Sequence, residues 1–260
     1  MALVAVAGAA GKTGRAVVKA LRSRSLSVRP LVRRPCGMDG EVIVDLLDAS
    51  SVRDGIRGVD AVYHMAPNMH PAEFEIGRNM ISAAQDLSVE RIVYHSVLHP
   101  QIEPMPHHWD KMRVEEALIN SRLRWTILQP APYIQNFKRP PDGVLRVPYR
   151  TDAPFSFVDL MDVAEAAATV LMEDKFDYGI YELAGPAVIT VEDLARGFGV
   201  SLESTDSGEA PPRLAAMFEY YDRHGLVGNP AALEMILGRP PAKALDALLR
   251  DSAAGDRADH

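Results

Sequence analysis

The sequence predicts an α/β fold in which a doubly wound parallel sheet is accompanied by a smaller C-terminal lobe. Three observations carry this prediction. Residues 4–21, VAVAGAAGKTGRAVVKAL, run from an apolar stretch through three glycines into a helical pattern. Apolar runs then alternate with helical patterns through the first half of the chain, which is typical of parallel strands joined by crossover helices. After Gln129 this alternation loosens, beginning with the turn-rich KRPPDG at 138–143.

The predicted elements follow from the spacing of apolar residues. Strands are expected at the short apolar runs, which are residues 3–7, 28–33, 41–48, 59–67, 91–98, 124–130 and 179–185. Helices are expected where the spacing is helical, at residues 15–21, 50–56, 74–85, 106–121, about 159–173 and 213–226. Residues 1–130 then form the core of the sheet, and residues 131–250 complete its edge and build the smaller lobe. Residues 251–260 are expected to be a disordered tail.

The glycine-rich turn resembles two kinds of phosphate-binding loop. A Walker A loop needs a glycine five residues before the glycine of Gly-Lys-Thr, but that position is Val6. Gly8, Gly11 and Gly14 have the spacing G-x-x-G-x-x-G instead. This is a variant of the dinucleotide fingerprint, in which a strand, a tight turn and a helix N-terminus face a pyrophosphate. The turn therefore predicts a dinucleotide site.

The end of the second strand indicates which dinucleotide binds. It reads PLVRRP and carries no acid, whereas an NAD site usually has a carboxylate for the ribose hydroxyls. Arg33, with Arg34 beside it, favours NADP(H), because a guanidinium matches a phosphate. The alternative is a solvated arginine pair. Lys12 adds positive charge near the adenosine phosphate, and Thr13 begins the helix.

Two acids follow the third strand. Asp45 and Asp48 either approach the adenine edge or cap the next helix, and the sequence leaves both interpretations open.

Composition excludes several classes of protein. The net charge of −7 argues against a general nucleic-acid binder, because such proteins neutralise phosphates. No apolar run reaches the length that a membrane helix needs. One cysteine, Cys36, fits a reducing compartment, so we expect a cytoplasmic protein. Arginine outnumbers lysine 22 to 6, which favours a bacterial source.

Four stretches resemble the atypical short-chain dehydrogenases/reductases: GAAGKTG at 8–14, LVRRP at 31–35, VDLLDASSVRDGIRGVDAVYH at 44–64 and ERIVYHSV at 90–97. The stretch HHWDKMRVEEALINSRLRWTILQPAPYIQNF at 107–137 is similar to the NmrA-like group. That group includes NADPH sensors and co-regulators, quinone oxidoreductases and, more distantly, plant isoflavone and benzylic ether reductases. The resemblance covers residues 1 to about 240.

The resemblance implies a Rossmann core, a C-terminal substrate lobe and a cleft above the nicotinamide. By position it assigns the three glycines to the pyrophosphate and Arg33 to the 2′-phosphate. It assigns Met65, Ala66 and Pro67, which follow the fourth strand, to the adenosine and ribose.

The wider superfamily uses Ser, Tyr and Lys, with Tyr four residues before Lys on one helix face. Lys111 matches the lysine, but His107 stands at the tyrosine position. His107 is a candidate proton donor in its place, since imidazole titrates near neutral pH. Ser96 ends the fifth strand, where the superfamily keeps its carbonyl-binding hydroxyl. Each of these residues also has an ordinary structural role as the alternative.

Further candidates lie near this constellation. Tyr133 is a second possible pocket donor, and His108 and Trp109 are candidates for stacking on cofactor or substrate, with a core position as the alternative for the tryptophan. His95 and His99 are four residues apart, but a strand followed by proline does not direct both toward one metal. No metal site is expected.

Two functions survive. In the first, the protein is an NADPH-dependent oxidoreductase that passes a hydride to a carbonyl, quinone or conjugated alkene of a small aromatic molecule. In the second, it is a non-catalytic NADP(H) sensor that acts through a protein partner. A reductase needs an open apolar pocket above the nicotinamide, whereas a sensor fills it with side chains such as Phe137, Phe155 or Tyr133. We expect a monomer or homodimer.

One stretch bears on the substrate. Met217, Phe218, Tyr221 and Leu226 form an apolar stripe that is either core, a substrate wall or a dimer surface.

Overall fold

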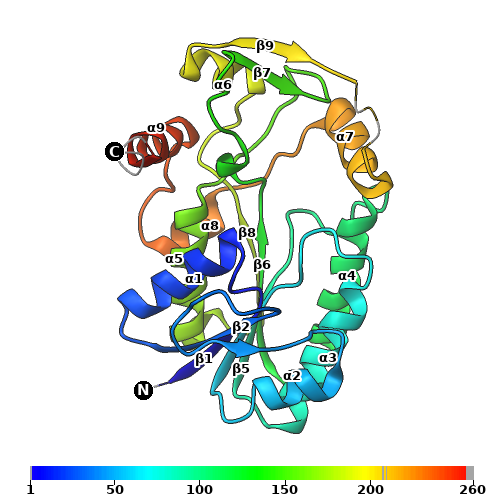
Figure 1. Cartoon of the computed structure of the whole chain (residues 1–260), viewed down its shortest axis with the longest axis vertical. Coiled ribbons are helices and arrows are strands. Elements are labelled where there is room, and N and C mark those ends of the chain that lie inside the picture. Colours follow the sequence, from blue (N-terminus) through cyan, green and yellow to red (C-terminus); the bar gives the residue numbers. More distant parts are fainter. Residues whose placement is uncertain (1, 207, 209, 256–260) are drawn as a thin grey trace.

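A parallel sheet between two layers of helices forms the body of the protein (Figure 1). The computed structural model describes residues 2–206, 208 and 210–255. Within these residues the main sheet has seven strands in the order β3-β2-β1-β4-β5-β6-β8. All neighbouring strands pair in parallel. The predicted α/β fold class is thereby confirmed.

The strands of the main sheet lie close to the predicted apolar runs. They are β1 (Leu3–Val6), β2 (Ser27–Val32), β3 (Val42–Ile43), β4 (Ala61–His64), β5 (Arg91–His95), β6 (Arg124–Pro130) and β8 (Gly179–Leu183). The strand order reverses between β1 and β4, and ligands of doubly wound sheets bind at this kind of reversal, beyond the carboxyl ends of the strands.

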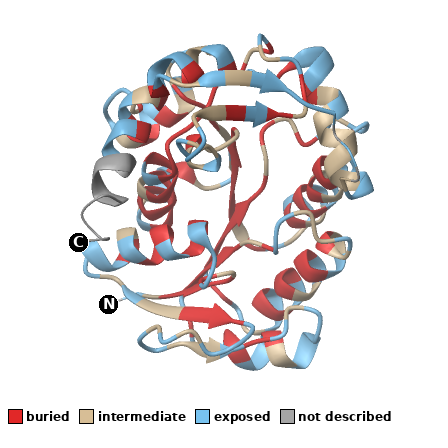
Figure 2. Ribbon diagram, turned by 45° about the horizontal axis from the view of Figure 1, so that its top comes forward, coloured by how far each residue is buried: buried red, intermediate tan, exposed pale blue. Residues whose placement is uncertain are grey.

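Helices cover both faces of the sheet. In Figure 1 one layer holds α1 (Lys12–Ser23), α5 (Leu160–Met172) and α8 (Ala231–Leu237), and the other holds α2 (Ala49–Gly55), α3 (Glu73–Asp86) and α4 (Pro106–Ile119). Figure 2 shows the buried residues gathered in the strands and on the inner sides of these helices. Two apolar clusters result, and the central strands separate them.

A smaller lobe sits above the carboxyl edge of the sheet (Figure 1). It contains a two-stranded parallel sheet of β7 (Val144–Val147) and β9 (Ser201–Ser204), with α6 (Val191–Phe198), α7 (Pro212–His224) and α9 (Ala244–Gly255). Two short 3₁₀ turns, η1 (Ile134–Asn136) and η2 (Asp174–Phe176), lie in the connections. The second half of the chain thus alternates between lobe and sheet, because α5 and β8 return to the main body.

Two local expectations differ from the structure. The third strand was expected over residues 41–48 but spans only Val42–Ile43, because the chain turns at Asp45, which accepts hydrogen bonds from the amides of Leu47 and Asp48. Asp48 in turn accepts hydrogen bonds from the amides of Ser50 and Ser51 and caps α2. Capping is therefore the role of Asp48. Helix α9 continues to Gly255, so the expected tail begins as helix, and residues 256–260 lie outside the described residues.

No helix in the described part of the chain combines the length and apolarity needed to cross a membrane.

The glycine turn depends on a close approach between α1 and the end of β1. A Cβ at Gly14 would lie 2.3 Å from the carbonyl oxygen of Gly8 and 2.6 Å from Cα of Ala9. Both neighbours are backbone atoms, so they cannot rotate away. Gly8 itself has a φ of +67°, a conformation that glycine adopts at little cost. Glycine at these two positions lets the helix begin directly against the strand.

We predict that Gly14→Ala destabilises the protein. An alanine normally stabilises a helix interior by about 1 kcal/mol relative to glycine, but here its methyl group meets backbone and should instead cost roughly 1–3 kcal/mol. Urea unfolding measures the change. Lys19→Ala, at an exposed position of the same helix, is the control and should be nearly neutral. Equal or higher stability of Gly14→Ala would contradict the packing argument.

Candidate active site

A large cavity opens over the carboxyl ends of the strands, between the main sheet and the lobe. Its volume is about 1050 Å³, at the upper end of the range for small-molecule and cofactor pockets. Most residues that the sequence singled out line it, although they come from five strand ends and from α1 and α4. They are Gly8, Gly11, Lys12, Thr13, Arg33, Arg34, Met65, Ala66, Pro67, Ser96, His107, His108, Lys111 and Tyr133.

Two expected site residues lie elsewhere. Gly14 sits behind the turn, where it allows the close packing described above. Trp109 is 41% exposed and is not among the lining residues. It follows His107 by two positions, which is about 200° around the helix, so the two side chains leave α4 in nearly opposite directions. The expectation that Trp109 stacks on a ligand in this cavity does not match its position.

The glycine turn presents unpaired backbone donors at one end of the cavity. Gly11 is the N-cap of α1 and has no side-chain cap, so the first amides of the helix are available to an anion. The Lys12 ammonium lies 3.2 Å from the carbonyl oxygen of Gln135 and 3.0 Å from Oδ1 of Asn136. Burial and the nearby Lys138 lower the pKa of Lys12. Lys12 therefore ties the turn to η1.

A carboxylate that the sequence did not single out shapes the loop after β2. Glu41 accepts hydrogen bonds from the amides of Cys36, Gly37 and Met38 at 3.1, 3.4 and 2.9 Å, and from the Cys36 thiol. The thiol and amide bonds lower the pKa of Glu41, and the carboxylate raises the pKa of Cys36. This loop carries Arg33 and Arg34, whose side chains are exposed at the cavity rim.

Lys111 is buried and paired with a carboxylate. Its Nζ lies 2.9 Å from Oε1 of Glu73, on α3, and 3.3 Å from the carbonyl oxygen of His95. The hydroxyl of Tyr94 donates to the same Glu73 oxygen at 2.9 Å. Sequence reasoning missed Glu73, because its spacing from Lys111 carries no local signal and the two meet only through the contact between α3 and α4.

Ser96 is engaged in a buried polar group. Its hydroxyl donates to Oε1 of Glu115, whose carboxylate also accepts two bonds of 3.0 Å from the amide of Gln129. Burial raises the pKa of Glu115. The hydroxyl proton of Ser96 is thus committed to the protein in this structure.

His107 and His108 are buried, and their rings meet edge to face with centroids 4.6 Å apart. Nδ1 of His107 and Nε2 of His108 have no hydrogen-bond partner in the described part of the chain. Burial lowers the pKa of His107 to about 4 and that of His108 to about 3. The expectation that His107 titrates near neutral pH is therefore wrong, since burial disfavours its charged form.

Three side chains from neighbouring strand ends form a hydrogen-bonded row beneath the cavity. The hydroxyl of Tyr133 lies 3.0 Å from Nε2 of His95, and Nδ1 of His95 lies 2.5 Å from the hydroxyl of Tyr63. His95 and Tyr133 line the cavity, whereas Tyr63 is fully buried. Burial lowers the pKa of His95 to about 3 and raises the pKa of Tyr133. The sequence had considered His95 only as a metal ligand.

Apolar side chains wall the far end of the cavity. Met217, Phe218, Tyr221 and Leu226, together with Phe137, line it. The apolar stripe of α7 and Leu226, which follows this helix, thus form a wall of the cavity. Phe155 was one of the side chains expected to fill the cleft if the protein were a sensor. It does not line the cavity and instead stacks on Phe157, with ring centroids 4.9 Å apart. The space between the sheet and α7 remains open.

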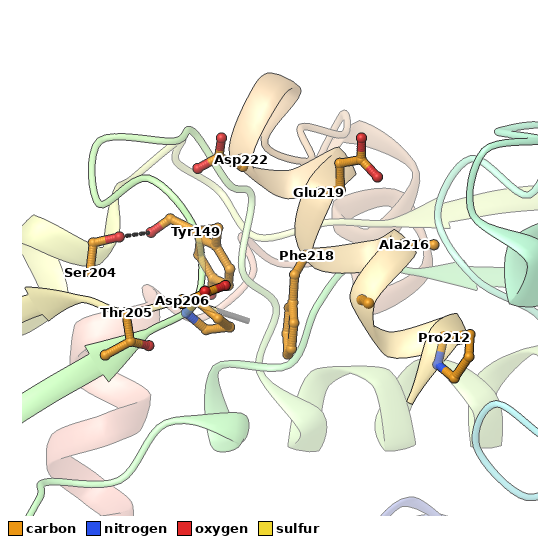
Figure 3. Close-up of a pocket in the computed structure, with 11 residues that line it drawn as sticks. Tyr149, Ser204, Thr205, Asp206, Pro212, Ala216, Phe218, Glu219 and Asp222 are labelled. Atoms are coloured by element: carbon orange, nitrogen blue, oxygen red, sulfur yellow. Dashed lines mark hydrogen bonds between the residues drawn. The ribbon is translucent and has the colours of Figure 1, made fainter. Parts of the chain in front are cut away.

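A second hollow of about 520 Å³ lies on the outer side of this wall (Figure 3). Tyr149 and Phe218 line both spaces, so they separate them. Figure 3 shows Glu219 and Asp222 of α7 at the rim of the outer hollow. The outer hollow is therefore more acidic than the main cavity.

Comparisons with known proteins agree with this geometry. The NmrA-like family matches residues 1–219. The (4-alkanoyl-5-oxo-2,5-dihydrofuran-3-yl)methyl phosphate reductase of Streptomyces griseus is 30% identical over 236 residues, which are 84% of this chain and 82% of the relative. Quinone oxidoreductase 2 of Escherichia coli is 25% identical over 206 residues, 74% of this chain and 72% of the relative. An NADPH-dependent quinone oxidoreductase from Escherichia coli, solved in complex with NADPH, has a TM-score of 0.83 at 23% identity and covers 95% of this chain and 99% of its own.

The buried histidines predict acid sensitivity. Burial lowers the pKa of His64 and of His95 to about 3, whereas an unfolded histidine titrates near 6.5. Below about pH 6.5 these histidines bind protons in the unfolded state but stay neutral in the folded state. The free energy of unfolding therefore decreases as the pH falls from about 6.5 toward 3.

We predict that His64→Phe flattens this loss. The variant removes one such proton, so the slope of unfolding free energy between pH 6 and 4 should fall by up to about 1.4 kcal/mol per pH unit. Urea unfolding at several pH values measures it. His224→Gln, at an exposed position, is the control and should keep the wild-type slope. An unchanged slope in His64→Phe would contradict the neutral, buried state of His64.

Proposed function

Because this chain belongs to the NmrA-like family, we propose that it is an NADPH-dependent reductase that delivers a hydride to a carbonyl, quinone or conjugated alkene of a small aromatic molecule. One observation carries the proposal: a single cavity runs from the glycine turn and the arginine loop to an apolar end walled by α7. A dinucleotide and an acceptor can both be held in such a cavity.

The residues at the polar end fit NADP(H). The amides that begin α1 suit the pyrophosphate, and Arg33 and Arg34 suit a 2′-phosphate. Met65, Ala66 and Pro67 flank the position assigned to the adenosine and ribose. The Glu41 carboxylate binds backbone amides of the loop that carries the two arginines. It therefore fixes the conformation of that loop without binding the phosphate itself. When bound, the reduced cofactor supplies the hydride.

The groups near the centre of the cavity have separate roles in this proposal. Lys111, held by Glu73 and the carbonyl oxygen of His95, keeps a positive charge for the ribose of the cofactor. His107 lines the cavity and offers a hydrogen bond from its neutral imidazole to the acceptor. Ser96 is bound to Glu115, and we assign it a supporting role rather than direct binding of the carbonyl.

The apolar end supports an uncharged acceptor. Phe137, Met217 and Phe218 line it, and flat aromatic molecules pack well on such side chains. Two cations of α4 and α7 are paired within the protein, Lys111 with Glu73 and Arg213 with Asp110. A quinone or aromatic ketone therefore suits this end of the cavity.

The open cavity also favours the reductase over the sensor. A sensor has no need for a second ligand, and its cleft can be closed by aromatic side chains. Here Phe137 and Tyr133 line the space and Phe155 is packed elsewhere.

We predict that the protein binds NADPH and oxidises it in the presence of small quinones. Fluorescence titration measures binding under anaerobic conditions, and nicotinamide absorbance measures turnover with a panel of quinones and aromatic ketones. Lys111→Met should reduce turnover by about 10²-fold if the ammonium orients the cofactor. Tight NADPH binding without turnover of any compound in the panel would favour the sensor.

We predict that Arg33→Asp weakens NADPH binding far more than NADH binding. Loss of a charge-assisted bond to the 2′-phosphate costs about 1.5–3 kcal/mol, roughly 10- to 100-fold in Kd, and NADH has no such phosphate. Arg122→Asp, at an exposed position outside the cavity lining, is the control and should leave the ratio of the two Kd values unchanged. Equal losses for both dinucleotides in Arg33→Asp would contradict the assignment.

A further inference from the structure

The row Tyr63–His95–Tyr133 places a phenol at the cavity although the tyrosine position of the helix holds His107. The three side chains come from β4, the last residue of β5 and the loop after β6. Two hydrogen bonds join them, 2.5 Å from Tyr63 to Nδ1 of His95 and 3.0 Å from Nε2 to Tyr133. Of these three residues, Tyr133 alone belonged to the sequence-based site.

His95 must be a neutral imidazole in this row. It is 6% exposed and shares its surroundings with Lys111, and both burial and that positive charge oppose a second proton. A neutral imidazole has one donor nitrogen and one acceptor nitrogen. Of its two bonds to tyrosines, one is therefore donated by the ring and the other is accepted by it.

Tyr63 decides which nitrogen carries the proton. Its side chain is 0% exposed, and in the described part of the chain the partner of its hydroxyl is Nδ1 of His95. A buried hydroxyl that donates to nothing is costly. Tyr63 therefore donates to Nδ1, which makes Nδ1 the acceptor and leaves the proton on Nε2. Nε2–H then donates to the oxygen of Tyr133.

Tyr133 is left with a proton of its own to give. Its oxygen accepts from Nε2–H of His95, so this bond does not use the hydroxyl proton. The proton of Tyr133 is therefore not used within the row and is available to an acceptor inside the cavity. Tyr133 and Thr13 both line that cavity.

We propose that Tyr133 is the proton donor of the reaction and that His95 and Tyr63 are positioning residues that direct its O–H toward the substrate. This inference rests on the reductase function proposed above. Hydride addition to the acceptor carbon moves an electron pair onto the acceptor oxygen, and that oxygen takes the proton of Tyr133. The bond from Nε2–H of His95 stabilises the phenolate that remains, and water entering the open cavity returns the proton.

In this proposal the row supplies the proton donor that is missing from position 107. His107 remains neutral at physiological pH because burial lowers its pKa to about 4, so it has no imidazolium proton to transfer. Tyr133 reaches the cavity from the other side, on the loop after β6, and restores a phenol to the constellation.

The tautomer of His95 can be measured without substrate or cofactor. Nitrogen-15 NMR of the imidazole should find the proton on Nε2 in the wild-type protein and a shift toward Nδ1–H in Tyr63→Phe, which removes the donor to Nδ1. Tyr181→Phe, in β8 and outside the cavity lining, is the control and should retain Nε2–H. A proton on Nδ1 in the wild-type protein would overturn the proposal.

Kinetics then test the donor. Tyr133→Phe should lower kcat about 10²-fold or more while the Kd for NADPH stays within about twofold, and Tyr63→Phe should lower kcat about 10-fold with little change in KM. Tyr133→Phe should also weaken binding of duroquinone, measured by fluorescence quenching. Wild-type kcat in Tyr133→Phe would overturn the proposal. Failure of the wild-type protein to bind NADPH would overturn the reductase function instead, and the tautomer measurement separates the two failures.

Discussion

The close contact between α1 and the end of β1 is the constraint on which the site depends. With no Cβ at Gly14, the helix begins at Lys12 directly beside the turn. Its first amides then face the cavity, Lys12 contacts η1, and Thr13 lines the same cavity as Tyr133. A helix displaced outward by one methyl group would shift all three together, so the anion-binding end and the chemical end of the cavity share one packing requirement.

Buried carboxylates organise the rest of the polar groups. Glu73 holds Lys111, and Glu115 holds Ser96. An unpaired charge or donor at these depths would be costly, and each pair turns a flexible side chain into a fixed one. The histidines complete this arrangement by staying neutral. The site consequently offers fixed hydrogen-bond donors to a bound ligand. Its positive charge is concentrated where the dinucleotide is proposed to lie.

An apolar wall and neutral donors together suit an acceptor that becomes charged only as it reacts. Phe137, Met217 and Phe218 can hold a flat neutral molecule, and a directed O–H meets negative charge as it develops on oxygen. Preorganised donors of this kind act in the transition state rather than on the resting substrate. The proposed reductase chemistry therefore needs no imidazolium.

Local patterns in the sequence determined the alternation of strands and helices, the glycine turn and the residues that surround the cavity, because apolar periodicity and turn chemistry depend on near neighbours along the chain. The same patterns misplaced Trp109, since the direction of a side chain around α4 depends on which face of that helix meets the sheet. They assigned His107 an ordinary pKa, which burial overturned. They singled out Tyr133 but had no signal for Glu41, Glu73 or the hydrogen bonds that join Tyr133 to His95 and Tyr63, because these residues meet only after separate strands and helices have packed. Hydrogen-bond partners and pKa values depend on neighbours in space, so only the tertiary structure decided them.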